Sequence, residues 1–453
     1  MCLTVPLPYI ADCSHLFRHI NAMPGAVWFD SGKPASGYGR YDIISAAPSE
    51  TLIADQGASQ LFIDAQSLLN QLPQIPVKAQ SVPFAGGLAG YFGYDLGSSQ
   101  LSKIPALPQA AQLPQARLGL YHWSLVSDHQ QQSTQLTFLD SCSVNVRSQV
   151  QQIVQQWLHK PLENASDFKL SGPFQASLTE QQYHRAIKRI HDYIIAGDCY
   201  QVNFAQHFSA QFQGDPYTAY QQLRSATPSP FSAYMAWQHQ GRQQAILCVS
   251  PERLLRVNRS GEVETKPIKG TIRREKCPVA DLSNADQLLN SHKDRAENLM
   301  IVDLLRNDLG KSCTPGSIQV PKLFALESFA NVHHLVSTVS GQLSPEKSAL
   351  QLLQGCFPGG SITGAPKRRA MEIIHELESC QRSAYCGSIG YISRCGRMDT
   401  NIAIRTLVAD GNALHCWGGG GIVADSNPHS EYQESMDKID VLMKSLEGIQ
   451  PSQ

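Results

Sequence analysis

Short hydrophobic runs separated by turn residues dominate the first part of the chain. Up to about residue 140 they predict short strands at 26–29, 41–44 and 84–92, the last of them punctuated by glycines. The glutamine-rich polar sequence that follows predicts a long loop at 130–135 and then an exposed helix at 150–156.

The pattern becomes sharper after residues 162–172, which are interpreted as a linker between two halves. Residues 177–180 (Ser-Leu-Thr-Glu) resemble a helix capping box, and apolar residues follow at helical spacing. These residues are Tyr183, Ile187, Ile190 and Ile194. Further along, the predicted strands are 231–237, 244–249, 253–258 and 262–265, the predicted helices are 292–308, 364–379 and 429–447, and a glycine-rich strand block runs over 385–423.

The mixture of strands and helices predicts an α/β protein without strict βαβ alternation. No G-x-G-x-x-G lies between a strand and a helix, so a dinucleotide-binding fold is disfavoured. No period of about 20–50 residues recurs, which argues against a solenoid or propeller. The length of 453 residues exceeds one ordinary domain but is reached by single intertwined α/β folds.

Composition narrows the class of protein. The net charge of -1 gives no reason to expect nucleic acid or an anionic membrane as partner. We expect neither a transmembrane segment nor a signal peptide, because no long apolar stretch occurs and the first residues lack a basic and an apolar region. The 12 cysteines include no C-x-x-C pair, which argues against a zinc site or a redox dithiol and favours a reducing cytoplasm.

Lys269 is the most informative polar residue. It lies in Pro-Ile-Lys-Gly-Thr at 267–271, which predicts a tight turn after the strand at 262–265. A lysine held there and partly desolvated can lose its proton and act as a nucleophile. The alternative is a solvated lysine in a surface hairpin.

Two acidic pairs have helical spacing. Asp294 and Glu297 follow Ser291, and Glu431 and Glu434 follow Asn427, so each pair can share one helix face. Together they offer the oxygen ligands that Mg²⁺ prefers. Alternatively, Asp294 completes a cap with Ser291, Glu431 favours a helix N-terminus, and Glu434 pairs with Lys438 one turn later.

Other candidates come from isolated residues. Glu252 lies at a strand junction, where a raised pKa would make it a general acid, although it could equally pair with Arg253 or Arg256. His334 alternates with apolar residues and faces either a site or the core, and Arg405 follows an apolar run, where an arginine often clamps a carboxylate.

Two glycine-rich segments could approach a ligand. Residues 359–366 lead into a helix and offer backbone N–H groups to an anion, with Lys367 nearby, but they lack the Gly-Lys-Ser/Thr of a nucleotide-binding loop. Residues 418–421 are four glycines, which fit either backbone lying flat against a ligand or a strand bulge.

Together these segments resemble the chorismate-utilising enzymes, a family that includes the large subunits of anthranilate synthase and aminodeoxychorismate synthase and the isochorismate and salicylate synthases. The resemblance is strongest over 180–445. The matching stretches are 250–253, 293–300, 302–309, 313–317, 364–367, 385–391 and 418–423, followed by Glu431-x-x-Glu434. The resemblance implies two sandwiched, mainly antiparallel sheets with outer helices in a single intertwined unit. It also implies an N-terminal region at 1–145 and a chorismate-binding catalytic domain at 175–450.

Within this family, lysine at position 269 resembles the aminodeoxychorismate synthase branch, because anthranilate synthases typically carry alanine there. The resemblance implies that Lys269 attacks ring C2 of chorismate while the C4 hydroxyl leaves, and that ammonia then attacks C4 and expels the lysine. The product would be 4-amino-4-deoxychorismate, for 4-aminobenzoate and folate synthesis. Glu252 as general acid and a carboxylate-bound Mg²⁺ would offset the developing charge.

The resemblance also implies roles for the remaining site residues. Glu297 and Glu434 would bind Mg²⁺ directly, Asp294 and Glu431 would act close by or through water, and His334 would be the active-site histidine. The implied substrate-binding residues are Gln201, Thr271, Ser361, Tyr385, Arg405, Gly419, Gly420, Gly421 and Lys438. Gln201 would replace the lysine base of water-using relatives, since ammonia needs no deprotonation to attack.

The N-terminal half resembles the family's regulatory or structural pocket, which can hold tryptophan. The matching residues are Ser31, Tyr38, Gly39, Arg40, Tyr41, Pro230, Phe231 and Ser232. No Gly-x-Cys-x-Gly elbow of a glutaminase occurs, so ammonia would come from a separate glutamine amidotransferase subunit. The rival hypotheses are an anthranilate synthase large subunit and a catalytically idle, tryptophan-sensing subunit.

Overall fold

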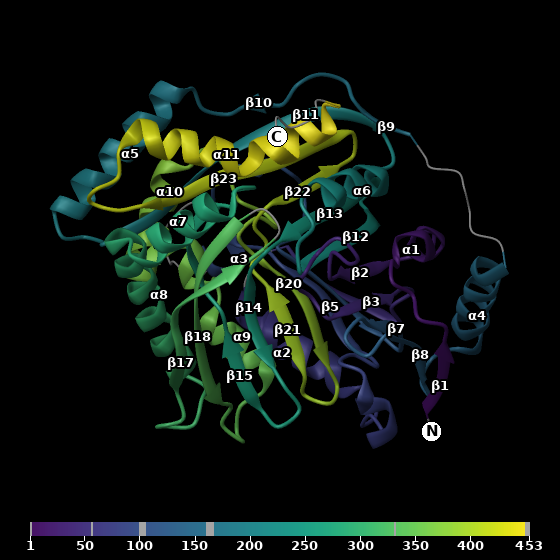
Figure 1. The fold of residues 1–453 in the computed structure, drawn as a ribbon. Helices are drawn as coiled ribbons and strands as arrows, with labels where there is room; N and C mark the ends of the chain where they lie inside the picture. The colour runs from purple at the N-terminus through teal and green to yellow at the C-terminus, as the bar shows by residue number, and fades with distance from the viewer. Residues whose placement is uncertain (1, 56–57, 99–105, 160–166, 330–331, 449–453) are drawn as a thin grey trace.

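Two antiparallel sheets packed face to face form the centre of the computed structural model (Figure 1). The structure describes residues 2–55, 58–98, 106–159, 167–329 and 332–448. All strand pairings between the described residues are antiparallel. None of the described helices is long and apolar enough to cross a membrane.

The larger sheet has 13 strands in the order β1-β8-β7-β3-β2-β12-β13-β22-β23-β11-β10, with β9 and β19 also paired to β11. Its strands are β1 (Cys2–Leu7), β2 (Val27–Asp30), β3 (Tyr41–Ser45), β7 (Trp123–Asp128), β8 (Ser133–Leu139), β9 (Phe168–Leu170), β10 (Gln175–Ala176), β11 (Gln201–Gly214), β12 (Phe231–His239), β13 (Arg242–Ser250), β19 (Gly364–Ala365), β22 (Thr406–Asp410) and β23 (Ala413–Ile422).

The smaller sheet has 10 strands in the order β16-β18-β15-β14-β21-β20-β5-β6-β4, with β17 also paired to β18. Its strands are β4 (Glu50–Ala54), β5 (Gly87–Phe92), β6 (Ala116–Tyr121), β14 (Arg253–Val257), β15 (Glu262–Thr265), β16 (Ile268–Arg273), β17 (Gln319–Ser328), β18 (Val332–Gln342), β20 (Ser388–Ser393) and β21 (Met398–Asn401). Strands from both halves of the chain enter both sheets, so the prediction of one intertwined α/β unit is confirmed.

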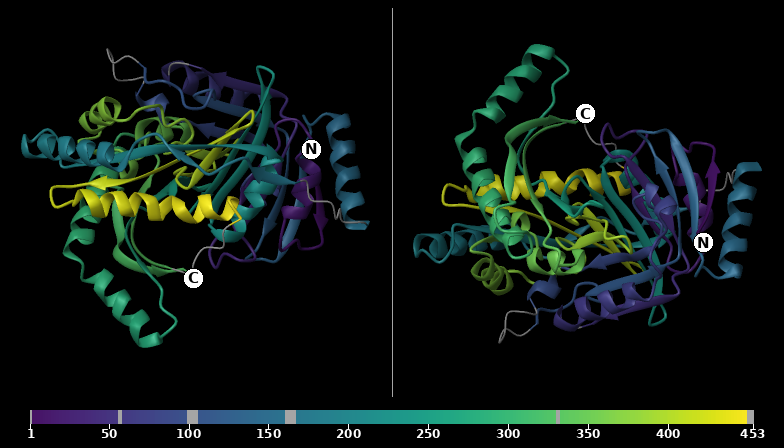
Figure 2. Two further views of the ribbon diagram at one scale, coloured as in Figure 1. Left: turned by 90° about the horizontal axis from the view of Figure 1, so that it is seen from above. Right: turned by 90° about the horizontal axis from the view of Figure 1, so that it is seen from below.

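Helices cover the outer faces of the sheets. They are α1 (Ser14–Ile20), α2 (Ala58–Asn70), α3 (Asp95–Ser98), α4 (Val144–His159), α5 (Glu180–Ile195), α6 (Pro216–Ala226), α7 (Pro278–Leu289), α8 (His292–Gly310), α9 (Ala349–Cys356), α10 (Lys367–Leu377) and α11 (Pro428–Leu446), with short 3₁₀ turns η1 (Val77–Ser81) and η2 (Gly360–Ile362). Both views of Figure 2 place α4 at one end of the molecule near the N-terminus, while α11 runs along the larger sheet.

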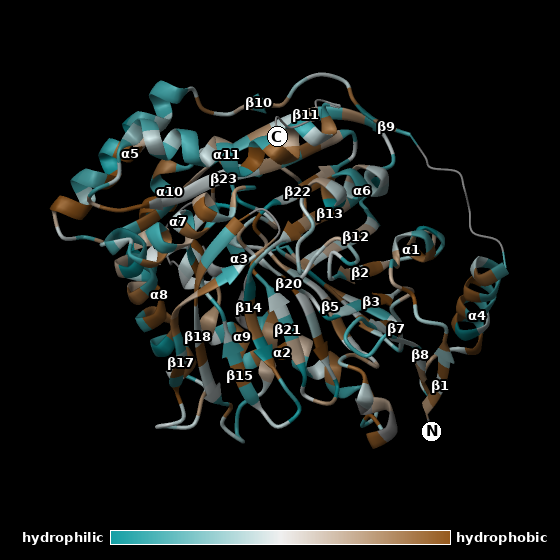
Figure 3. Cartoon of the chain, in the orientation of Figure 1, coloured by the Kyte–Doolittle hydropathy of each residue, from teal (hydrophilic) through white to brown (hydrophobic). Residues whose placement is uncertain are grey.

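Strand periodicity explains why the larger sheet is buried on both faces. Consecutive strand residues point to opposite faces, so Val27 and Ile246 enter the core between the sheets, while Trp28 and Leu247 enter a second core beneath the helices. The outer helices alternate hydrophobic and hydrophilic residues, as α11 shows in Figure 3. Helix α11 therefore packs its apolar face on β23 and leaves polar residues for a site.

Several sequence predictions about the second half are confirmed. The strands predicted between 231 and 265 are β12 to β15, and the helices predicted at 292–308 and 429–447 are α8 and α11. The helix predicted at 364–379 begins only at Lys367, because residues 364–365 pair with β11 as β19.

Other predictions are wrong in detail. The predicted loop at 130–135 is only a tight turn, since β8 begins at Ser133 and pairs with β7. The predicted linker includes Phe168–Leu170, which forms β9, while 160–166 lie outside the described residues. Helix α4 is longer than expected and is not wholly exposed, because Val150 and Val154 are buried.

The cap of α5 lies two residues beyond the predicted one. The side chain of Thr179 accepts a hydrogen bond from the backbone of Gln182, and the side chain of Gln182 accepts one from the backbone of Thr179. This is the reciprocal arrangement of a capping box. The prediction of a capping box is therefore correct, but its predicted position is wrong by two residues.

Candidate active site

Lys269 lies on a strand rather than in the predicted turn. It belongs to β16, whose register against β18 shifts between Ile268 and Thr271. Its Nζ donates a hydrogen bond to the carbonyl oxygen of Ser361 at 3.1 Å. Burial lowers the pKa of Lys269, while the charges of Glu297 and Glu252 oppose that shift. The side chain is thus held inside the protein, and the surface-hairpin alternative is wrong.

Glu252 is buried in the two-residue connection between β13 and β14. The hydroxyl of Ser361 donates a hydrogen bond to its Oε1 at 3.0 Å, so Ser361 contacts Glu252 and Lys269 together. Burial raises the pKa of Glu252 to about 7, against the lowering effects of Lys269 and of hydrogen bonds. A carboxyl group with this pKa can hold or release a proton near neutral pH.

The predicted alternative, a pair between Glu252 and a neighbouring arginine, does not occur. Arg253 instead donates to both carboxylate oxygens of Asp399 and forms an ion pair with Glu264. Arg256 also pairs with Glu264. Glu252 is therefore left facing Ser361 and Lys269.

Helix α8 places its acidic pair against the strand that carries Lys269. Ser291 caps this helix, accepting a hydrogen bond from the backbone N–H of Asp294. Gly270 has a φ of +84°, and a methyl group there would lie 3.0 Å from Cβ and Cγ of Asp294. A glycine is needed at this close approach because other residues rarely adopt that conformation.

Helix α11 brings the second acidic pair to the same place. Glu431 is buried, accepts a hydrogen bond from the Ser426 hydroxyl at 2.6 Å, and lies 3.8 Å from Lys293 Nζ of α8. Glu434 pairs with Lys438 at 2.8 Å, as one of the sequence alternatives predicted. The two acidic helices therefore approach each other at their N-terminal turns.

Three of the carboxylates, those of Glu297, Glu431 and Glu434, have shifted pKa values. Burial raises the pKa of Glu297, and the negative charges of Asp294 and Glu431 raise it further against two lysines. Burial also raises the pKa of Glu431. The pKa of Glu434 is lowered, because Lys438, Lys293 and Lys269 together outweigh its burial. Carboxylate oxygens are the ligands that a hard divalent cation such as Mg²⁺ prefers.

The four glycines of β23, residues 418–421, lie beside the carboxylates of Glu431 and Glu434. Their register with β11 is continuous over Ala413–Ile422, so the bulge alternative is wrong. A methyl group on Gly420 would lie 3.4 Å from Glu431 Oε2, 3.5 Å from Lys438 Nζ and 3.8 Å from Glu434 Oε1. Lys438 also donates to the carbonyl oxygen of Gly419. Because Gly420 has no side chain, space remains between β23 and the side chains of Glu431 and Lys438.

Arg405 supplies a free positive charge. It has a φ of 50°, and burial lowers the pKa of its guanidinium. Within the described part of the chain this guanidinium has no hydrogen bond or ion pair to another side chain. Because an unpaired buried charge is costly, Arg405 is suited to an anionic ligand.

His334 and Thr271 are joined across β18 and β16. The Thr271 hydroxyl lies 2.8 Å from Nδ1 of His334. Burial, and then the charge of Arg405, lower the pKa of His334 to about 4, so this imidazole is neutral at neutral pH. The core-histidine alternative is partly right, since His334 is buried, but it also faces Arg405.

Comparison with known proteins gives this geometry a family. A model of chorismate binding enzymes matches residues 25–444. The chain belongs to the chorismate-binding enzyme family. It is 42% identical to aminodeoxychorismate synthase component 1 of Salmonella typhimurium over 98% of each chain, and 43% identical to that of Escherichia coli K12 over 95% of each. A crystal structure of anthranilate synthase component I from Streptococcus pneumoniae matches with a TM-score of 0.78 at 29% identity, covering 89% of this chain and 92% of that one.

Two further candidate site residues of this chorismate-binding enzyme, Tyr385 and Gln201, lie against β23. Tyr385 is buried and stacks on Trp417 of β23, with ring centroids 6.1 Å apart and planes 9° apart. Gln201 is fully buried at the start of β11, and neither polar atom of its side chain has a hydrogen-bond partner among the described residues. Its amide nitrogen lies where a side chain on Gly421 would stand, so the amide lies against the glycine strand.

Lys367 does not serve as an anion-binding residue. Its Nζ pairs with Asp308 at 2.6 Å and donates to the carbonyl oxygen of Cys356. The glycine-rich turn before it instead positions Ser361, whose backbone and side chain contact Lys269 and Glu252. The segment thus serves the site through Ser361 rather than through its helix N-terminus.

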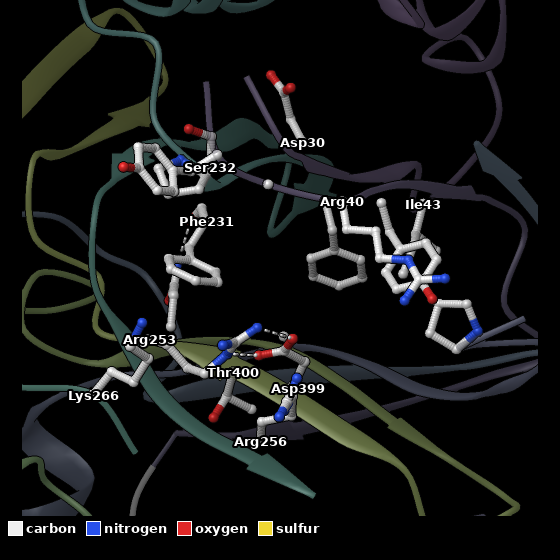
Figure 4. A pocket seen from close by; sticks show the side chains of 18 of the residues that line it. Asp30, Arg40, Ile43, Phe231, Ser232, Arg253, Arg256, Lys266, Asp399 and Thr400 are labelled. Carbon is white, nitrogen blue, oxygen red and sulfur yellow. Dashed lines mark hydrogen bonds and ion pairs between the residues drawn. The ribbon is translucent and has the colours of Figure 1, made fainter. Parts of the chain in front are cut away.

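A separate cavity of about 810 Å³ is lined by residues from both halves of the chain and from both sheets (Figure 4). Of the residues expected to form a tryptophan pocket, all but Ser31 line it. Ser31 is buried beside it and donates to Asp42. Figure 4 shows Arg253 bonded to Asp399 on one wall and Phe231 with Ser232 on another. This cavity does not contain Lys269.

Sequence reasoning missed three supporting residues of this chorismate-binding enzyme. Ser426 and Lys293 hold Glu431, and Trp417 supports Tyr385. Lys293 stands beside Asp294 and could have been suspected from its charge. The other two act through the folded arrangement of β23 and the turn before α11, which spacing along the chain does not reveal.

Proposed function

We propose that this protein converts chorismate and ammonia to 4-amino-4-deoxychorismate, as the large subunit of an aminodeoxychorismate synthase. The observation that carries the proposal is that Ser361 contacts both Lys269, whose pKa is lowered by burial, and Glu252, whose pKa is raised by burial to about 7. A lowered pKa favours the neutral, nucleophilic form of the amine, and a protonated acid nearby can assist the departure of a hydroxyl group. The relatives with about 42–43% identity carry the same name.

In the proposed reaction the neutral Nζ of Lys269 forms a bond to ring C2 of chorismate. The ring double bonds shift, the C4–O bond breaks, and Glu252 gives its proton to the departing hydroxyl, which leaves as water. Ammonia then attacks C4, the double bonds shift back, and the C2–N bond to Lys269 breaks. The proton lost by the ammonia nitrogen returns to Glu252, which completes the cycle.

Recognition of the substrate is proposed for the residues around this pair. Arg405 would hold one substrate carboxylate, with Tyr385 and Thr271–His334 at its sides. Gly419, Gly420 and Gly421 would let the other carboxylate approach the backbone, with Lys438 nearby. Gln201 would present a neutral amide to ammonia, since ammonia attacks without losing a proton first.

We propose Mg²⁺ as the cofactor. The carboxylates of Glu297 and Glu434 would bind it, with Asp294 and Glu431 close by or through water. Support comes from the all-oxygen donor set and from the raised pKa values of Glu297 and Glu431, to which neighbouring carboxylate charges contribute after burial. When bound, the ion would offset negative charge on the substrate and its leaving group.

We further propose a glutamine amidotransferase subunit as the ammonia donor, in a cytoplasmic heterodimer. The designation "component 1" of the relatives supports a partner.

We also propose that the cavity lined by Tyr41 and Phe231 holds tryptophan, since apolar rings and a few polar groups line it. Titration with tryptophan, followed by the fluorescence of the protein, tests this binding. The substitutions Arg40→Ala and Ser232→Ala should each weaken the affinity for tryptophan.

The experiment that tests the function is incubation of the purified protein with chorismate, Mg²⁺ and ammonium. We expect 4-amino-4-deoxychorismate as the product, identified by chromatography and mass spectrometry. The structural match to an anthranilate synthase component makes anthranilate the second candidate product. Anthranilate appearing as a fluorescent product with no other enzyme present would reject the proposal. If Lys269→Ala left chorismate consumption unchanged, a catalytically idle sensing subunit would be favoured.

A further inference from the structure

Two helices meet at a cluster of three potential metal ligands outside the carboxylate site. Glu180 is the first residue of α5, His184 lies one turn later on the same face, and His429 lies in the first turn of α11. One ligand atom from each residue lies within 4.8 Å of the other two. Helices α5 and α11 lie side by side in Figure 1, which brings these residues of distant sequence together.

The spacing of the ligand atoms is compatible with a shared ion. Nδ1 of His429 forms a hydrogen bond of 3.3 Å with Oε1 of Glu180, and Nε2 of His184 lies 3.6 Å from the same oxygen. The hydrogen bond is long for a charge-assisted one, which measures about 2.7–2.9 Å. Two ligand atoms that are each about 2.1 Å from a tetrahedral zinc ion lie about 3.4 Å apart.

His184 provides a second, independent observation. Its Nε2 is buried and has no hydrogen-bond partner among the described residues, although it is aimed at Glu180 and His429. The ring also packs edge-on against Tyr432, with centroids 6.0 Å apart, which fixes its orientation. A buried imidazole nitrogen without a partner is costly, and a metal ion would satisfy it.

The backbone that carries these residues is held in place. The reciprocal cap of Thr179 and Gln182 fixes the first turn of α5, and the side chain of Asn427 accepts hydrogen bonds from His429 and Ser430 in α11. The ligand side chains are accessible to solvent, since Glu180 is 49% exposed and His429 is 75% exposed. An ion can therefore enter the site from solvent, and the backbone that carries the ligands is already fixed by the two caps.

We infer that Glu180, His184 and His429 form a binding site for a divalent transition metal of the zinc class, with a fourth position open to water. Two imidazoles and one carboxylate favour Zn²⁺ or Co²⁺ over Mg²⁺, which prefers oxygen ligands. The missing C-x-x-C pair excludes only a thiolate site of that type. The ion would join the start of α11 to α5, and its ligand His429 lies two residues before Glu431.

Binding of Zn²⁺ to the full-length protein in saturating Mg²⁺ tests the site, because Mg²⁺ competes for the carboxylates of the proposed active site. We expect one Zn²⁺ per chain in competition with a chromophoric chelator. His184→Ala and His429→Ala should each weaken binding by at least about tenfold, since loss even of an outer partner typically costs that much. His191→Ala, on the same helix but outside the cluster, is the matched control.

A second readout protects the test against variants that fold poorly. Co²⁺ added to the wild-type protein in saturating Mg²⁺ should give the visible absorption of a four-coordinate ion with nitrogen ligands, and Glu180→Gln should change that spectrum. Glu180→Gln leaves the Thr179–Gln182 cap untouched. The inference is overturned if wild-type protein binds no Zn²⁺, or if the histidine variants and the His191→Ala control bind it equally well.

Discussion

Substitution of Glu252 by glutamine separates the chemical role of this residue from its structural cost. The amide keeps the shape of the carboxyl group and can still accept the hydrogen bond from Ser361. It cannot ionise and cannot give a proton to a leaving group. We therefore expect activity and stability to change in opposite directions.

The stability change follows from the raised pKa. Burial raises the pKa of Glu252 from the usual 4.5 to about 7, so the folded protein keeps a proton that the unfolded chain releases. In the wild type the contribution of Glu252 to the free energy of unfolding should fall by about 3 kcal/mol as pH rises from about 4.5 to about 7. Glu252→Gln should lack this loss. It should match the wild type near pH 4.5 and exceed it above pH 7.

The activity change follows from the loss of the proton donor. General acid catalysis contributes about 10²–10⁴-fold, so turnover of chorismate with ammonium should fall by that factor in Glu252→Gln. In the wild type the rate should decline as pH rises through about 7, because Glu252 then loses its proton.

Urea unfolding at several pH values and steady-state chorismate consumption supply the two measurements. The exposed Glu50→Gln provides the matched control and should change neither. The reasoning is refuted if Glu252→Gln retains wild-type turnover. It is also refuted if this variant and the wild type lose stability equally between pH 4.5 and pH 7.

Three more predictions concern the substrate and the cation. Arg405→Ala should raise KM for chorismate by about 10–100-fold with a smaller effect on kcat, since it removes charge-assisted hydrogen bonds; an unchanged KM would contradict the carboxylate role. Gly420→Ala should fold normally yet lower activity by about tenfold or more, because its methyl would stand 3.4 Å from Glu431 Oε2 and 3.5 Å from Lys438 Nζ. Wild-type activity in this variant would show that the space is not used. Treatment with EDTA should abolish turnover without changing the circular dichroism, and Mg²⁺ should restore it; activity that persists after metal removal would contradict the cofactor proposal.

Much of the fold of the second half follows from patterns in the sequence. Strands β12 to β15 and helices α8 and α11 were predicted because their hydrophobic periodicity is unambiguous. The position of Lys269 on a bulged strand was not predicted, because Pro267 and Gly270 are also typical of a turn. Lys269 lies on a strand because β16 pairs with β18, which is more than 60 residues away in the sequence, and the register of this pairing shifts between Ile268 and Thr271.

The sequence allowed the residues of the candidate site to be predicted, but not the contacts between them. Spacing indicated that Glu297 and Glu434 each share a helix face with a second acid, but not that α8 and α11 approach each other. Nor does spacing show that Ser361 contacts both Lys269 and Glu252, since these residues are about a hundred positions apart. Such contacts depend on the packing of the two sheets, which local sequence does not encode.

Mass spectrometry of the protein incubated with chorismate and Mg²⁺ but without ammonia tests the central claim most directly. The account predicts a covalent adduct with the mass of chorismate less one water, located on the peptide that contains Lys269 and absent from Lys269→Ala. Unmodified wild-type protein, together with a Lys269→Ala variant that still aminates chorismate at the wild-type rate, would contradict it.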